Sequence, residues 1–242
     1  LKKLGHTIVE NDVALVPIAL KDSWVKKVSG VTLKDIKLMT FKNGVKQKVY
    51  KGKLLFTHFG ISGPTVLNMS REVGELLQVT EESEYLVGDE SKRDVIIILD
   101  MFPNLDGGAL RQKLHTLLTE QSNKKISNSL CALIPSALVD LVLTLTKINS
   151  ATPGHSVRSD DRKALVTIMK AIPLHVFGLL GKDKAVVSSG GVVLNQVNFK
   201  TMQSRLIPQL YLVGDVLNID RPSGGYSLQL CWTTGYVAGN SC

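Results

Sequence analysis

One stretch near the end of the chain, residues 206–239, restricts the possible folds more than any other part of the sequence. Its letters are LIPQLYLVGDVLNIDRPSGGYSLQLCWTTGYVAG. The apolar run 210–213 predicts a buried parallel strand, which ends at the pair Gly214-Asp215. A loop with Gly224-Gly225 then leads into a predicted helix that begins near Tyr226. A strand, a carboxylate at its end and a glycine-rich entry to a helix are how α/β folds form nucleotide-cofactor sites.

The 242 residues are enough for one large domain or two smaller ones, and 44% of them are hydrophobic. The most apolar stretch, residues 130–145, is interrupted by proline and polar residues, so it predicts a buried helix and not a membrane span. The chain begins at Leu1 without the apolar core of a signal peptide, and we expect it to be a piece of a longer protein. Its three cysteines form no metal-binding or disulfide pattern, so we expect a cytoplasmic protein without a metal site.

Positive charge is concentrated at the beginning of the chain. Residues 1–53 contain 12 Lys and Arg against 4 Asp and Glu, which accounts for the whole formal net charge of +8. Such a skew can mark contact with a nucleic acid or a phosphate. No Lys/Arg-rich run and no interleaved aromatic strip accompanies it, however. We therefore prefer a solvated, lysine-rich sheet face, and keep nucleic-acid binding as the alternative.

The first quarter of the chain has the signature of β-structure. Four short segments (13–18, 36–41, 45–50 and 53–57) are separated by turn signals. Asn43-Gly44 is a strong hairpin signal because both residues tolerate positive φ, and Lys51-Gly52 is interpreted as a second turn. This region predicts a small antiparallel sheet or barrel.

Residues 54–64, LLFTHFGISGP, join an apolar strand end to a helix predicted over 65–77, with Pro64 at its first position. Small residues and a lone histidine in such a loop would let a ligand approach the backbone N–H groups. In the alternative interpretation the loop is a capped tight turn, and His58 is hydrogen-bonded to the backbone.

The middle of the chain predicts a strand over 95–99 that ends at Asp100, followed by a helical section. Helices are expected over 107–121, over 126–147 with Pro135 starting a second helix or kinking the first, and over 160–172 with Ser159 as N-cap. Strand character returns at 174–177 and 184–188, and the letters SSGGV at 188–192 predict a small-residue turn.

Several motifs together resemble the HI0933-like family of flavoproteins, also described as NAD(P)/FAD-dependent or aminoacetone-oxidase-family oxidoreductases. They are GHTI at 5–8, ALVPI at 14–18, LLFTHFGISGP at 54–64, SSGGV at 188–192, TMQSRLIPQLYLVGDVLNIDRPSGGYSLQ at 201–229 and WTTGYVAG at 232–239. The resemblance spans nearly the whole chain, with the motifs in order.

The resemblance implies an α/β protein with an α+β insertion, in which a Rossmann-like FAD domain is split in sequence by a β-rich domain and a small helical domain. The β-rich inserted domain would comprise 1–102 and 174–187, the helical subdomain 103–173, and the C-terminal strand-helix part of the FAD domain 188–242. No G-x-G-x-x-G fingerprint occurs, so the adenine and pyrophosphate half of the cofactor site is missing from this sequence.

The resemblance also implies an FAD-dependent oxidoreductase that transfers a hydride between a small-molecule substrate and the flavin, with NAD(P)H as a candidate electron donor. Asp215 would accept a hydrogen bond from a ribityl hydroxyl. The positive end of the following helix would lie at the flavin N1–C2=O edge, where negative charge develops on reduction. The implied cofactor-binding residues are Gly214, Asp215, Gly224, Gly225, Tyr226, Ser227, Leu228 and Gln229. Candidates for the substrate side are His58, Gly60, Ser62, Gly63, Gly190 and Gly191.

Three alternatives to this interpretation stay open, and the motifs name no catalytic residue in any of them. In the first, Gly224-Gly225 is an ordinary left-handed turn that starts a helix capped by Asp215. In the second, the basic residues 1–53 form a nucleic-acid-binding module. In the third, the chain is a truncated flavoprotein without function.

Overall fold

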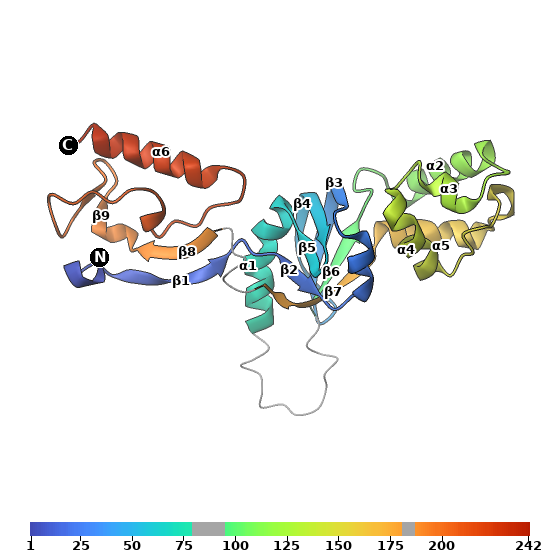
Figure 1. The fold of residues 1–242 in the computed structure, drawn as a ribbon, viewed down its shortest axis with the longest axis horizontal. Helices are drawn as coiled ribbons and strands as arrows, with labels where there is room; N and C mark the ends of the chain where they lie inside the picture. Colours follow the sequence, from blue (N-terminus) through green and yellow to red (C-terminus); the bar gives the residue numbers. More distant parts are fainter. Residues whose placement is uncertain (79–94, 181–186) are drawn as a thin grey trace, which may run out of the picture. The chain divides into compact units, whose positions relative to one another are not determined.

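The computed structural model describes residues 1–78, 95–180 and 187–242, which fall into two compact units. Unit 1 comprises residues 1–17, 67–71 and 180–242, and unit 2 comprises 18–66 and 72–179. Figure 1 shows the elements of both. The predicted strand segment 184–186 lies outside the described residues. No helix of the described part is long and apolar enough to cross a membrane.

Unit 2 is built on a closed antiparallel barrel with strand order β2-β5-β4-β3-β6-β7 (Figure 1). Its strands are β2 (Ile18–Leu20), β3 (Thr32–Lys42), β4 (Val45–Thr57), β5 (Gly60–Ser62), β6 (Val95–Asp100) and β7 (Ile172–Leu179). Alternate residues point inward, as Ile36 and Leu38 of β3 and Leu54 and Phe56 of β4 do, and these four are 0–1% exposed. The predicted antiparallel sheet or barrel is therefore confirmed as a barrel.

The two turn signals of the β-region have different outcomes. Asn43 and Gly44 have φ of 51° and 77° and join β3 to β4, so the predicted hairpin is confirmed. The turn predicted at Lys51-Gly52 is wrong, because β4 continues through it with an irregular register opposite β3. Gly52 is explained by packing, since a Cβ there would lie 2.4 Å from Thr65 Oγ1.

The helices form where the sequence predicts them. Helix α1 (Pro64–Gln78) begins at the predicted proline, and the section between β6 and β7 contains α2 (Gly107–Glu120), α3 (Ile126–Leu130), α4 (Ser136–Thr146) and α5 (Ser159–Lys170). Pro135 precedes α4, so it starts the second helix of that pair. The N-cap predicted at Ser159 is wrong: Arg158 is the N-cap, and the Asp161 carboxylate accepts a hydrogen bond from its backbone N–H at 3.1 Å.

A buried carboxylate joins the barrel to these helices. Asp100, the last residue of β6, is 1% exposed and pairs with Lys37 of β3 at 3.2 Å and with Lys170 of α5 at 2.8 Å. Its other oxygen accepts a hydrogen bond from the backbone N–H of Phe102 at 2.9 Å. The Lys170 ammonium also donates to the carbonyls of Phe102 and Leu105, at 2.7 and 2.6 Å. The beginning of the helical section, at Phe102 and Leu105, and its end, at Lys170, are thereby held together beside the end of β6.

We expect Asp100→Ala to lower the free energy of unfolding by about 2–4 kcal/mol, because it leaves two ammonium groups without their shared carboxylate. Urea unfolding followed by circular dichroism measures the change. The exposed Asp140→Ala on α4 is the matched control and should stay within about 0.5 kcal/mol of the parent. Equal effects of both substitutions would contradict the bridging role of Asp100.

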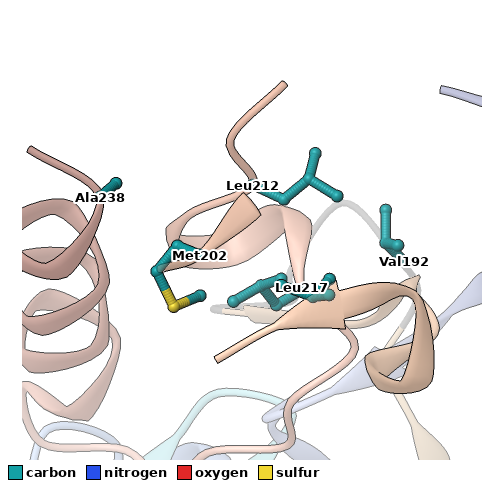
Figure 2. Close-up of a cluster of buried hydrophobic side chains, with 6 residues drawn as sticks. Val192, Met202, Leu212, Leu217 and Ala238 are labelled. Atoms are coloured by element: carbon teal, nitrogen blue, oxygen red, sulfur yellow. The ribbon is translucent and has the colours of Figure 1, made fainter. Parts of the chain in front are cut away.

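Unit 1 has a small core of its own. Strand β1 (Ile8–Ala14) pairs with β8 (Val187–Val192), β9 (Val197–Asn198) pairs with β10 (Gln203–Ser204), and helix α6 (Tyr226–Gly239) ends the unit. The buried side chains of its core are Val192, Val197, Met202, Leu212, Leu217 and Ala238. Figure 2 shows this cluster, with all of them labelled except Val197. The turn predicted at 188–192 is therefore wrong, since these residues belong to β8.

The parallel strand predicted over 210–213 is also absent from the described structure. Its one ladder contact is an isolated antiparallel bridge between Tyr211 and Gln203. Two backbone hydrogen bonds flank this bridge, from Ser204 N–H to the Leu210 carbonyl and from Leu212 N–H to the Met202 carbonyl, so the run meets the 202–204 segment in an antiparallel and not a parallel sense. The run instead places Leu212 in the core of unit 1. The split Rossmann-like domain stays a prediction.

Candidate cofactor loop

The loop 217–225 joins a short 3-10 turn, η7 (Gly214–Val216), to helix α6. Gly225 is the N-cap of α6 with φ of 90°, and as a glycine it offers no side chain to cap the first turn. The first N–H groups of a helix have no acceptor within the helix and coincide with its positive dipole end. The predicted helix start is confirmed, and Asp215 does not act as its cap.

The glycines of this region serve two different purposes. A Cβ at Gly224 or Gly225 would meet no atom within 4 Å, so the backbone there is open to an approaching group. A Cβ at Gly214 would lie 2.9 Å from Cys231 Sγ, and the Gly214 N–H donates to Thr234 Oγ1 at 2.9 Å. Gly214 therefore lets η7 pack directly on α6.

A buried arginine organises the loop. The Arg221 side chain is 6% exposed, and its Nη2 lies 2.8 Å from Asp215 Oδ1, whereas the Asp215 side chain is 62% exposed. Arg221 Nε also donates to Ser227 Oγ in the first turn of α6, at 3.2 Å. The guanidinium thus connects η7 to the start of the helix. Arg221 was not among the residues predicted from the sequence, where its one signal was a cation within a glycine-containing loop.

Arg221 also carries an unused donor. Its Nη1 is buried and has no hydrogen-bond partner among the described residues. Buried donors in folded proteins are almost always satisfied, by protein, water or ligand. An acceptor oxygen is therefore expected beside it. The open glycines, the positive end of the helix and the exposed Asp215 suit a ligand with hydroxyl groups and electron-rich oxygens.

The remaining predicted cofactor residues form the first turn of α6. Tyr226 and Leu228 are 57% and 58% exposed, and Ser227 is held by Arg221. The Gln229 side chain donates to Thr233 Oγ1 at 3.0 Å, and its N–H donates to the Gly225 carbonyl.

Two of the substrate-side candidates lie beside the cofactor loop within unit 1. A Cβ at Gly191 would lie 2.5 Å from the carbonyl oxygen of Val216, so this glycine lets β8 approach the segment that carries Asp215. The neighbouring Asn218 N–H donates to the Val192 carbonyl at 3.1 Å. The structure thus brings Gly190-Gly191 and the Asp215 segment together. A substrate contact of these glycines stays a prediction.

The other candidates lie in unit 2, around the turn between β4 and β5. A Cβ at Gly60 would lie 2.2 Å from the Ile18 carbonyl oxygen, so this glycine is required for strand packing. His58 is exposed, and its ring makes an edge contact with Phe59 at 4.8 Å between centroids. Its side chain makes no hydrogen bond among the described residues. Ser62 ends β5, and Gly63, with φ of 101°, precedes α1.

The described residues contain no group of three or more His, Cys, Asp or Glu side chains that could hold a metal ion. The fold comprises a barrel with a helical insertion, and a second unit that ends in helix α6. The chain belongs to the HI0933-like family, because the family model for the HI0933-like protein barrel and H2TH domain matches residues 13–187.

Three curated relatives match almost the entire chain. It is 28% identical over 240 residues to a 3-dehydro-bile acid delta(4,6)-reductase of Clostridium scindens, covering 99% of this chain and 56% of that protein. It is 27% identical over 244 residues to a ribosomal RNA dihydrouridine synthase of Escherichia coli, covering 98% and 53%. The same-named protein of Haemophilus influenzae is 26% identical over 238 residues, again covering 98% and 53%. The chain thus spans about half the length of these relatives.

We expect Arg221→Met to lower the free energy of unfolding by about 1–2 kcal/mol and to speed amide exchange at residues 226–229, because η7 and α6 lose their common link. Arg221→Lys should recover only part of the loss, since an ammonium cannot reproduce the planar fork that contacts both partners. Denaturant unfolding and hydrogen exchange measure these effects. Arg111→Met on the exposed face of α2 is the control and should leave exchange in α6 unchanged.

Proposed function

We propose that this chain forms the flavin-proximal part of an FAD-dependent reductase, which transfers a hydride between the flavin and a small-molecule substrate, with NAD(P)H as electron donor. The observation that carries the proposal is the loop in which Asp215, Arg221 and Ser227 are linked at the start of α6, whose N-cap is a glycine. The two enzyme names among the relatives support it. One is a reductase, and the other is a synthase of dihydrouridine, which is uridine with two hydrogens added.

Each loop residue has a role that follows from its contacts. FAD, when bound, would supply the ring that carries the hydride. Asp215 would accept a hydrogen bond from a ribityl hydroxyl, mainly through the oxygen that Arg221 does not contact. Arg221 would hold Asp215 in position and offer its unused Nη1 to an acceptor. The N–H groups of the first turn of α6 would stabilise negative charge at the flavin edge.

A fusion protein tests this proposal. The chain is expressed alone and joined to the region of the Escherichia coli relative that lies outside the match, and visible flavin absorbance is recorded after gel filtration. We expect colour in the fusion only. Asp215→Ala in the fusion should weaken FAD affinity by about tenfold, the effect of one lost hydrogen bond to a charged group.

The exposed Asp140→Ala serves as the control in the fusion and should leave FAD affinity unchanged. A folded but colourless fusion would contradict the flavoprotein proposal. Full flavin retention by the Asp215→Ala fusion would contradict the role of this carboxylate. A coloured isolated chain would show that the loop binds flavin without the other half of the site.

A nucleic acid is the second candidate substrate, and two observations favour it. Two relatives are named ribosomal RNA dihydrouridine synthases, and the barrel carries much of the positive charge. Lys48 pairs with Glu72 at 3.6 Å, and Lys37 pairs with Asp100. Lys46 and Lys51 are exposed on β4 without an acidic partner in the described part of the chain. Both lysines are therefore available to phosphates.

Lys46→Glu/Lys51→Glu should weaken binding to a ribosomal RNA fragment at low salt and reduce the slope of log affinity against log salt by about 2, one for each lost phosphate contact. Fluorescence anisotropy over a salt series measures both quantities. Arg111→Glu/Lys113→Glu on the exposed face of α2 makes the same change in charge elsewhere. Equal effects of the two pairs, or no binding of the parent at low salt, would contradict this candidate.

A further inference from the structure

A hollow of about 220 Å³ lies in unit 2 between α4 and a short 3-10 helix, η2 (Ser23–Val28). Residues three positions apart are aligned on a 3-10 helix, so Trp24 and Lys27 share one side of η2, and both line the hollow. The half-buried Trp24 ring makes an edge contact with the buried ring of Phe56, at 5.8 Å between centroids. The wall formed by η2 therefore combines an aromatic ring that is held in place with a cation.

The second wall is one face of α4. Residues three and four positions apart share a face of an α-helix, and the residues that α4 contributes follow this spacing. They are Ala137, Asp140, Leu141 and Thr144. Ala137 and Leu141 provide apolar surface, whereas Asp140 and Thr144 provide hydrogen-bonding groups. The Thr144 hydroxyl donates to the Asp140 carbonyl at 2.7 Å, which leaves its oxygen able to accept a further hydrogen bond.

The polar groups of the hollow are not used by the fold. Lys27 and Asp140 are exposed, and neither forms an ion pair within the described part of the chain. The indole N–H of Trp24 also has no hydrogen-bond partner among these residues. A concave site with apolar walls and a few polar groups without partners is the usual form of a small-molecule site.

The charges around the hollow favour an anionic ligand. Lys26, beside Lys27 in the last turn of η2, is a second exposed cation. The carboxylate of Asp22 is already occupied, because it accepts the His175 N–H at 2.7 Å and contacts the His175 Nδ1 at 3.0 Å. Two cations therefore face one available carboxylate, that of Asp140. A zwitterion would leave one cation without a partner, whereas an anionic ligand with N–H groups would match all three charges.

We propose that this hollow, which we call the η2–α4 pocket, binds a nucleotide through its base and its phosphate. Unpaired bases stack on aromatic side chains and form hydrogen bonds along their edges. The base would lie against Trp24 and donate to Asp140, and the phosphate would contact Lys27. Guanine presents two adjacent N–H groups, which match the two oxygens of one carboxylate, whereas each other common base presents one such group at that edge. The pocket is therefore expected to prefer guanine.

A free nucleotide and a nucleotide within single-stranded RNA share this chemistry. If RNA is the source, the pocket rests on the nucleic-acid candidate above, and it adds a base contact to the phosphate contacts of Lys46 and Lys51. The pocket uses no residue of the cofactor loop. Nucleotide binding and flavin binding can therefore fail independently of each other.

Tryptophan fluorescence tests the pocket in the isolated chain. With Trp232→Phe in every protein, Trp24 is the remaining tryptophan, and a base stacked on it should quench its emission. We expect GMP to bind about tenfold more tightly than UMP, the effect of one additional hydrogen bond to a charged group. Asp140→Asn should abolish this preference, since an amide has one acceptor oxygen. Lys27→Gln should weaken GMP binding about tenfold and leave guanosine, which has no phosphate, unchanged.

Lys113→Gln on the exposed face of α2 makes the same change in charge and should bind GMP like the parent, as should Lys46→Glu/Lys51→Glu. Stronger quenching by a short guanine-containing single-stranded RNA than by GMP would support RNA as the source, and weaker quenching would support a free nucleotide. No quenching by either at low salt would overturn the proposal, even if the fusion binds flavin. Equal GMP binding by the parent, Asp140→Asn and Lys27→Gln would also overturn it, because the two charged groups would then take no part.

Discussion

Closure of the barrel depends on one short strand. β5 has only three residues, yet it bridges β2 and β4. It can do so because a Cβ at Gly60 would overlap the Ile18 carbonyl oxygen, at 2.2 Å. Any side chain there would separate β5 from β2 and open the interior, where Ile18 and Ile61 are fully buried. Closure leaves no free strand edge, and it allows a helical section to be inserted between two paired strands, β6 and β7, whose junction Asp100 holds.

Unit 1 is stabilised differently, since it has short strands and a core of few residues. Its cofactor loop depends on a buried guanidinium, which contacts Asp215 on one side and Ser227 on the other. A buried arginine loses its hydration and is tolerated only when its donors find acceptors. The Nη1 of Arg221 is therefore a buried donor that still lacks an acceptor among the described residues. Such positions are expected at binding sites, where the ligand supplies the missing acceptor.

The predictions from the sequence were correct where a residue acts through its own backbone preference, and wrong where its role depends on a residue far along the chain. Asn43-Gly44 and Pro64 act through their own backbone preferences, and both were predicted correctly. Gly52 was misinterpreted as a turn residue because the atom that requires it, Thr65 Oγ1, belongs to a different element. Residues 188–192 have the composition of a turn and become a strand only by pairing with β1 (Ile8–Ala14), near the other end of the chain.

The apolar run 210–213 is a second case in which local composition did not determine the backbone pairing. Its composition is that of a buried strand, and Leu212 is indeed buried, but the run bonds to residues 202–204 through one antiparallel bridge and two flanking hydrogen bonds, a pairing that composition does not specify. Arg221 could not be selected from the sequence, since its importance comes from two contacts made across the loop. Local propensity thus predicted the helices and the hairpin, and missed the residues whose role is set by distant partners.

Helix α6 carries or adjoins two features of unit 1 that lack a partner among the described residues: the Arg221 donor next to its first turn and the exposed apolar side chains on its outer face. Its buried face, through Thr234 and Ala238, holds η7 and the core in place. Its first turn follows an open loop and lies beside the unpartnered Nη1 donor of Arg221. Its outer face carries Trp232 and Tyr236, which are each more than half exposed. A polar ligand could accept a hydrogen bond from Arg221 but would not bury the exposed aromatic side chains of the outer face. An apolar surface could bury those side chains but would offer the Arg221 donor no acceptor. The donor and the apolar face therefore differ in the chemistry that could cover them: an acceptor oxygen for Arg221, and an apolar surface for Trp232 and Tyr236.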